Sequence, residues 1–133
     1  MKRIIEIGEE IYFKRTVTRE DIASFGGNVV HDVYSTFALC RDAEYTTRLF
    51  VLDVIEEDEE GVGISLSIDH LGPAFPGEEV SFRGEVTSFE KGKLICNWEA
   101  EVGDRKVARG TTGQKIMRKS DIERLFNKQE SNG

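Results

Sequence analysis

Hydrophobic positions recur with a helical period from Ser35 to about Ile55 and with a period of two from Val62 onward. The first segment runs for about five turns without glycine or proline. Its apolar face carries Leu39, Ala43, Phe50 and Val54. Small residues at the centre of this face would let a helix lie close to a sheet. The pattern therefore predicts one long buried helix, followed directly by a strand.

The remaining segments are mostly strand-like. Residues 9–17 are rich in β-branched and aromatic residues, and three further runs, 79–89, 93–102 and 105–117, are joined by short turns. Thr18, with Asp21 three residues later, predicts a short capped helical turn ended by Gly26 and Gly27. Ser120 is expected to cap a final amphipathic helix. We expect one α+β domain over residues 1–126, with an antiparallel sheet wrapped around a long central helix, and a disordered C-terminal tail over residues 127–133.

Between residues 62 and 70 the alternation assigns two faces to one strand. Val62, Ile64, Leu66, Ile68 and His70 fall on the face expected to pack on the helix, and Gly63, Ser65, Ser67 and Asp69 fall on the other. An antiparallel sheet with a single covering helix has exposed edges, and pairing with a second copy is a simple way to cover one of them. We therefore expect a homodimer.

Charge and composition narrow the function classes. The chain has 18 lysines and arginines against 25 acidic residues, a net charge of -7, which argues against a nucleic-acid partner or an anionic membrane surface. The start lacks the apolar core of a signal peptide and no later segment is long enough to span a bilayer, so a cytoplasmic protein is predicted. Two well-separated histidines without an acid cluster predict no metal site. A local basic cluster that includes Arg109 would be the place for an anionic ligand, but solvated strand-edge charges are the favoured explanation of this cluster.

Three polar residues stand out because they lie on or beside the apolar helix: Thr36, Glu44 and His70. Each has an ordinary structural explanation. Thr36 would serve as a helix cap, unless Ser35 is the cap and leaves it free; Glu44 would pair with Arg48 one turn later; and His70 would be a satisfied core residue. Thr36 and Glu44 are about 12 Å apart along a helix axis, so they cannot touch within one chain. They would need a third group between them or a dimer interface.

At these intervals the residues resemble the fluoroacetyl-CoA thioesterase family, which has the hotdog fold. In that family a threonine opens the central helix, a glutamate follows eight residues later, and a histidine follows 26 residues after the glutamate, with a glycine seven before it. Thr36, Glu44, Gly63 and His70 reproduce these intervals. The resemblance extends from Val17 to about Lys115. It departs at Gln114, the position aligned with an arginine of the family, so a preference for very small or halogenated acyl groups is not carried over.

The resemblance implies an acyl-CoA thioesterase for small or medium acyl groups that needs no cofactor, since coenzyme A is part of the substrate. Thr36 would be the nucleophile or would position a water molecule, His70 would be the general base, and Glu44 would orient it. Backbone N–H groups near Phe37 and at Gly63 would bind the oxyanion, with Gln114 and Arg109 as further substrate contacts. Arg41 and Arg48 are expected to face solvent.

Two other functions are compatible with the sequence. A hotdog enoyl-CoA hydratase is faintly similar over residues 17–25 and His31, but His31 and Asp32 are adjacent rather than separated by several residues. A non-catalytic acyl-CoA-binding module would keep the pocket without turnover. Hydrolysis of a thioester distinguishes the proposed enzyme from both.

Overall fold

The computed structural model describes residues 1–25 and 28–132, with side chains for all of these except residue 25 and residues 128–132. The elements in chain order are β1 (Glu10–Thr16), η1 (Arg19–Asp21), β2 (Ile22–Phe25), β3 (Asn28–Tyr34), α1 (Thr36–Val54), β4 (Glu59–His70), β5 (Glu79–Glu90), β6 (Lys93–Val102), β7 (Arg105–Arg118) and α2 (Lys119–Asn132).

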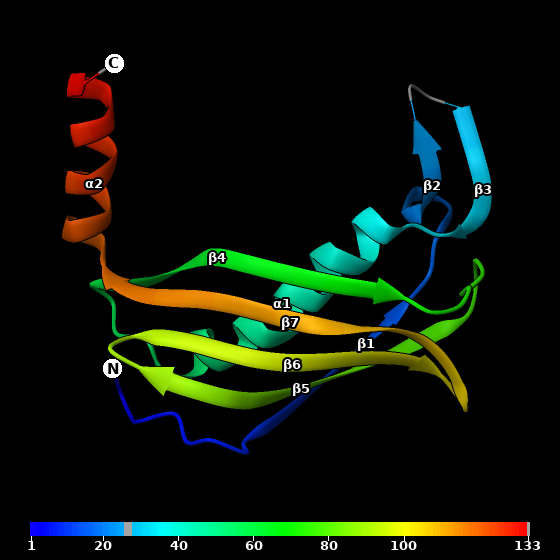
Figure 1. Cartoon of the computed structure of the whole chain (residues 1–133), viewed down its shortest axis with the longest axis horizontal. Helices are drawn as coiled ribbons and strands as arrows, with labels where there is room; N and C mark the ends of the chain where they lie inside the picture. Colours follow the sequence, from blue (N-terminus) through cyan, green and yellow to red (C-terminus); the bar gives the residue numbers. More distant parts are fainter. Residues whose placement is uncertain (26–27, 133) are drawn as a thin grey trace.

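Five of the strands form one antiparallel sheet in the order β1-β5-β6-β7-β4, and α1 lies across one of its faces (Figure 1). The predicted hotdog architecture is confirmed. Two apolar clusters lie between helix and sheet. One, around Tyr34, Leu39 and Trp98, packs beneath the first half of α1, and the other, around Phe50, Val54 and Leu94, packs beneath its second half.

The region before α1 differs from the sequence prediction. The capped turn is confirmed, because the Asp21 carboxylate accepts the Thr18 N–H at 2.9 Å, but it ends at Asp21. Residues 22–25 instead pair with β3 in a separate two-stranded hairpin. Gly26 and Gly27, which we expected to end the turn, lie outside the described residues. Three valines in β3 favour an extended backbone, and this tertiary pairing outweighs the helical signal upstream.

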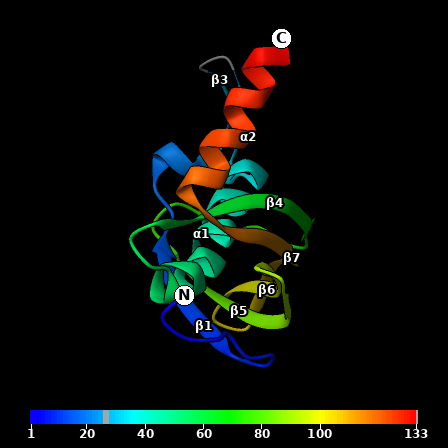
Figure 2. The ribbon, with the colours of Figure 1, turned by 90° about the vertical axis from the view of Figure 1, so that its left-hand side faces the viewer.

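The two ends of the sheet carry elements that project from it. The hairpin of β2 and β3 rises at one end and α2 at the other, both on the side of β4 (Figures 1 and 2). Helix α2 continues to Asn132 and so includes residues 127–132, which the sequence analysis assigned to a tail; no glycine or proline interrupts it before Gly133.

Strand β4 is an edge of the sheet. It pairs with β7 on one side, and no strand of the described chain pairs with its other side. Ile64 and Leu66 are exposed on it. None of the helices among the described residues is long and apolar enough to cross a membrane.

Candidate active site

Thr36 and His70 lie in contact. Thr36 is the first residue of α1, but Ser35 is the cap: its Oγ accepts the Ala38 N–H at 3.0 Å. The Thr36 hydroxyl is thereby free, and its Oγ1 lies 2.9 Å from Nδ1 of His70 at the end of β4. Both side chains are exposed. A hydroxyl hydrogen-bonded to an imidazole is the arrangement that activates an alcohol or a water molecule.

Glu44 lies against Gly63. A β-carbon at Gly63 would overlap Oε1 of Glu44, so this carboxylate is accommodated because the strand has a glycine there. The expected helical pair with Arg48 is not formed. Arg48 binds Oε1 of Glu60 at 2.8 Å and the Gly61 carbonyl at 3.2 Å. The Glu44 side chain is exposed, and it does not form an ion pair within α1.

A β-bulge brings Gly63 and His70 to the same face of the sheet. Gly63 is opposite Gln114 and Ser65 is opposite Gly113, which leaves Ile64 unpaired. The extra residue reverses the alternation. Gly63 therefore faces α1, as His70 does, whereas strict alternation had assigned them to opposite faces. Ser67 and Asp69 face away from the helix, as expected, and Ser67 bonds Thr111 on that outer face at 2.8 Å.

Within one chain these residues form two separate pairs. Glu44 is about 12 Å beyond Thr36 along α1, and Gly63 is roughly 20 Å before His70 along β4. Thr36 with His70 lies at one end of the helix, and Glu44 with Gly63 lies farther along it. Thr36 and Glu44 therefore do not meet within one chain, as expected.

Gln114 is buried beneath α1. Its side chain is 2% exposed, and its Nε2 donates to Oγ1 of Thr47 at 3.0 Å. Thr112 donates to the same oxygen at 2.8 Å. These three side chains form a polar layer between the two apolar clusters. Gln114 lies opposite Gly63 and beneath Glu44, so it adjoins the candidate site, but its amide is occupied by the helix.

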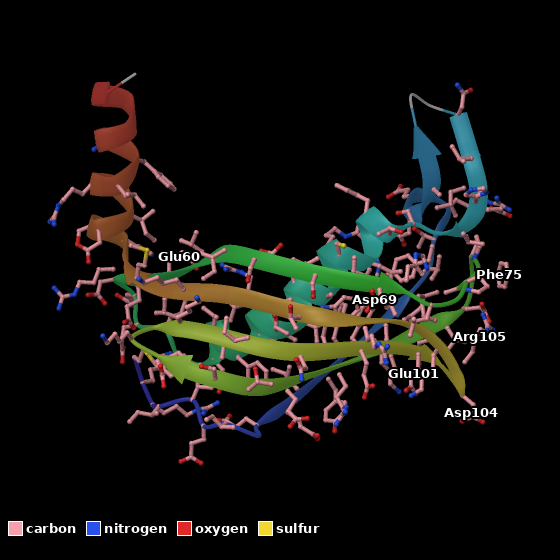
Figure 3. All side chains as sticks on the ribbon, viewed as in Figure 1. Glu60, Asp69, Phe75, Glu101, Asp104 and Arg105 are labelled. Atoms are coloured by element: carbon pink, nitrogen blue, oxygen red, sulfur yellow. The ribbon has the colours of Figure 1, made fainter. Side chains whose placement is uncertain are left out.

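The other predicted contacts are divided between two faces. Phe37 is 81% exposed beside Thr36. Arg109 lies on the outer face of the sheet, where its Nε is 3.9 Å from Asp69 (Asp69 is labelled in Figure 3). It lines a shallow polar hollow there and is separated from Thr36 and His70 by the sheet. His31 lies in β3, and its side chain is exposed.

Two buried aspartates and two partly exposed arginines form an ionic network that anchors the start of α1, and the sequence did not predict it. Arg15 and Arg41 both bind Asp21, at 2.8 and 2.9 Å, and Arg41 also binds Asp42 at 3.0 Å. The Tyr34 hydroxyl donates to Asp42. Arg41 is exposed, as expected, but its guanidinium also joins η1 to α1. The sequence carried no signal for this network, because only the structure shows that Asp21 and Asp42 are buried and therefore need ionic partners.

The pKa of Asp21 reflects this network. Burial favours the neutral acid, but the Thr18 N–H and the guanidinium groups of Arg41 and Arg15 outweigh it and lower the pKa to about 2. Because the folded-state pKa is below the unfolded value, the ionised carboxylate stabilises the fold above about pH 4, and this stabilisation disappears as pH falls to about 2.

Replacing Asp21 by asparagine should therefore lower the free energy of unfolding at pH 7 by about 2 kcal/mol or more. Urea denaturation at several pH values would measure it. The matched control is Asp32→Asn, because Asp32 forms an exposed ion pair with Arg19 at 3.2 Å that should contribute little. The proposed role of the network would be contradicted if both substitutions lowered the free energy of unfolding equally. It would also be contradicted if the loss caused by Asp21→Asn did not become smaller below pH 4.

A known protein family matches most of the chain. The sequence model of the family described as fluoroacetyl-CoA-specific thioesterase matches residues 17–120. The chain belongs to this family. The matched region contains all four residues of the two pairs. The search of curated proteins found no match.

Solved structures of thioesterases share the fold of this family member. A Thermus thermophilus hypothetical protein of the thioesterase superfamily is 30% identical over 98% of this chain and 96% of its own, with a TM-score of 0.90. A point mutant of the fluoroacetyl-CoA-specific thioesterase FlK is 17% identical over 96% of this chain and 99% of its own, with a TM-score of 0.87. A 1,4-dihydroxy-2-naphthoyl-CoA thioesterase from Synechocystis is 15% identical over 83% of each chain, with a TM-score of 0.66.

Proposed function

We propose that this protein hydrolyses a small or medium acyl-CoA thioester. The observation that carries the proposal is the 2.9 Å contact between Oγ1 of Thr36 and Nδ1 of His70 at the start of α1. It joins a hydroxyl to a base beside a helix N-terminus, where backbone N–H groups of the first turn have no acceptors within the helix. Such groups can stabilise the oxyanion that forms when a thioester carbonyl is attacked.

In the proposed reaction His70 removes a proton as the thioester carbonyl is attacked. The attacking oxygen belongs either to Thr36 or to a water molecule that Thr36 positions, and coenzyme A leaves as its thiol. His70 would then return the proton to the leaving sulfur. If Thr36 is the nucleophile, this step leaves an acyl ester on its oxygen, and His70 would then activate a water molecule that hydrolyses the ester and releases the acid. Glu44 would orient the imidazole and stabilise its protonated form. No cofactor is required by this scheme, and the described residues contain no group of three or more potential metal ligands.

Glu44 is too far from His70 to act in its own chain, and a homodimer resolves this. If the free edge of β4 pairs antiparallel with its copy, a two-fold axis at Ser67 aligns Ser65 with Asp69 of the partner subunit. The bulged residue Ile64 has no partner in this register. The next aligned pair is therefore Gly63 with His70 of the partner subunit. Residues opposite one another must point to the same face, and Gly63 and His70 do. Each Glu44 would thus complete the partner's pair of Thr36 and His70.

The substrate class is supported by solved relatives. Structures of fluoroacetyl-CoA thioesterases contain fluoroacetate with CoA, or acetyl-CoA. This chain has a neutral Gln114 held by Thr47 at the position aligned with an arginine of the family, so we do not extend the preference for fluorinated acyl groups to it.

The proposal is tested by measuring thiol release from acyl-CoA esters of increasing chain length. The protein has two cysteines, of which Cys96 is buried, and burial raises the pKa of its thiol to about 12. Cys40 is half-buried and its contribution is subtracted with a sample lacking substrate. We expect turnover with at least one short or medium chain. Binding of CoA esters without hydrolysis would favour a non-catalytic binding module.

A further inference from the structure

Helix α2 carries an apolar stripe that its own subunit covers only in part. Ile122, Leu125 and Phe126 are spaced to share one face, and Leu125 and Phe126 are 48% and 57% exposed. Neither apolar cluster of the described residues includes a side chain from α2. An isolated helix of this length is only marginally stable in water. We therefore expect this stripe to pack against an apolar surface of another subunit.

A second uncovered apolar surface follows the end of β4. Leu71 and Phe75 are 49% and 45% exposed, at the end of the molecule opposite α2 (Phe75 is labelled in Figure 3). This surface is held in place from within its subunit. The Leu71 N–H donates to the Val107 carbonyl at 2.8 Å, and the Arg105 guanidinium lies 5.7 Å from the centre of the Phe75 ring.

The dimer of the proposed function brings these two surfaces together. Arg118, at the base of α2, is opposite Glu59 at the start of β4. The two-fold axis at Ser67, with the bulge at Ile64, aligns Glu59 with Ala74 of the partner subunit. The base of α2 then stands beside residues 71–75 of the partner. Helix α2 also rises from the sheet on the side of the free β4 edge, which is the side the partner would occupy (Figures 1 and 2).

We infer that α2 is a dimer arm that packs Leu125 and Phe126 on Leu71 and Phe75 of the partner subunit. This inference rests on the proposed dimer. The contact would cover both exposed apolar surfaces at once, twice in each dimer. It would also hold the segment that directly follows His70, and so couple the arm of one subunit to the site of the other.

Disulfide trapping between two differently tagged chains tests this contact. One chain carries Leu125→Cys and the other Phe75→Cys, both in a Cys40→Ala background. We expect a cross-link between the two chains under mild oxidation. The matched control replaces Leu125→Cys by Arg124→Cys, because Arg124 is exposed and directly precedes Leu125, which places it about 100° away around the helix. Cross-linking should be much weaker with this control.

The dimer itself is tested separately by Ser67→Cys. A residue on the two-fold axis meets its own copy, so this variant should form a disulfide-linked dimer, whereas Ser65→Cys, two residues away on the same outer face, should not. If Ser67→Cys does not cross-link and the protein is monomeric, the proposed dimer and the arm both fail. If Ser67→Cys cross-links but Leu125→Cys and Phe75→Cys do not, the dimer stands and the arm is refuted.

Affinity gives a second measure that does not depend on cysteine geometry. We expect Phe126→Ala to weaken the dimer about tenfold or more, and Phe126→Ala combined with Phe75→Ala to weaken it less than the product of the single effects, because the two rings share one contact. Sedimentation at a range of concentrations would measure both. A Phe126→Ala dimer as tight as wild type would overturn the inference.

Discussion

Replacement of His70 by alanine is expected to lower kcat for thioester hydrolysis by about 10³-fold, because the reaction loses the base that accepts a proton from the attacking hydroxyl or water. Thr36→Ala should have an effect of similar size, since the hydroxyl 2.9 Å from His70 would be lost. Thr36→Ser retains a hydroxyl and should keep much more of the activity. The measurement is the release of CoA from the best ester of the chain-length series.

The control for this prediction is His31→Ala. His31 is the other histidine of the chain and lies exposed on β3, so its replacement should leave kcat within a few-fold of wild type. Circular dichroism and the midpoint of thermal unfolding would show that each variant is folded. Full activity in folded His70→Ala would exclude the proposed base. If His31→Ala lost as much activity as His70→Ala, a role of the hairpin of β2 and β3 in catalysis would be indicated instead.

The second large effect is recovery of activity when two inactive variants are mixed. In the proposed dimer each site takes Thr36 and His70 from one subunit and Glu44 from the other. A hybrid of His70→Ala and Glu44→Ala subunits therefore has one site with both substitutions and one with neither. If subunits exchange freely in an equal mixture, half of the dimers are hybrids, and each hybrid has one intact site out of two. The mixture should recover about a quarter of wild-type activity, well above either variant alone.

The same experiment excludes the alternative arrangement. If Glu44 acted on His70 of its own chain, both sites of every hybrid would carry one substitution, and mixing would restore nothing. Exchange is verified by copurification of two differently tagged chains. The control mixture pairs His70→Ala with Thr36→Ala: both residues belong to the same proposed half of the site, so each hybrid site keeps one defect and no recovery is expected. Recovery in this control would contradict the assignment of Thr36 and His70 to one subunit.

Most of the fold could be predicted from periodicity. The long apolar face around Leu39 and Phe50 is incompatible with anything but a buried helix, and alternating segments separated by short turns favour an antiparallel meander. These signals are local, since they depend on residues near one another in the chain. The assignment of Ser35 rather than Thr36 as the cap was also within reach, because a serine directly before a helical segment is a strong N-terminal signal.

Features that depend on contacts between distant segments could not be predicted in this way. The bulge at Ile64 is set by pairing between β4 and β7, and it alone turns Gly63 toward α1. Arg48 binds Glu60 and not Glu44 on its own helix, and Arg41 binds Asp21, which is 20 residues away in sequence. A partly buried charge is stabilised by an opposite charge that is close in space, whatever their separation in sequence. The hairpin before α1 likewise depends on pairing, because β2 is held by β3, whose three valines favour an extended backbone.

For the candidate site, the identity of the residues could be predicted from the sequence, but their contacts could not. Thr36, Glu44, Gly63 and His70 were identified from their intervals, and helix geometry was sufficient to separate Thr36 from Glu44. Which residues meet is a different matter, because contact between α1 and β4 depends on how the sheet twists beneath the helix. That packing joins Thr36 to His70 and Glu44 to Gly63, and both pairs lie along β4, an edge strand whose outer side pairs with no strand of the described chain.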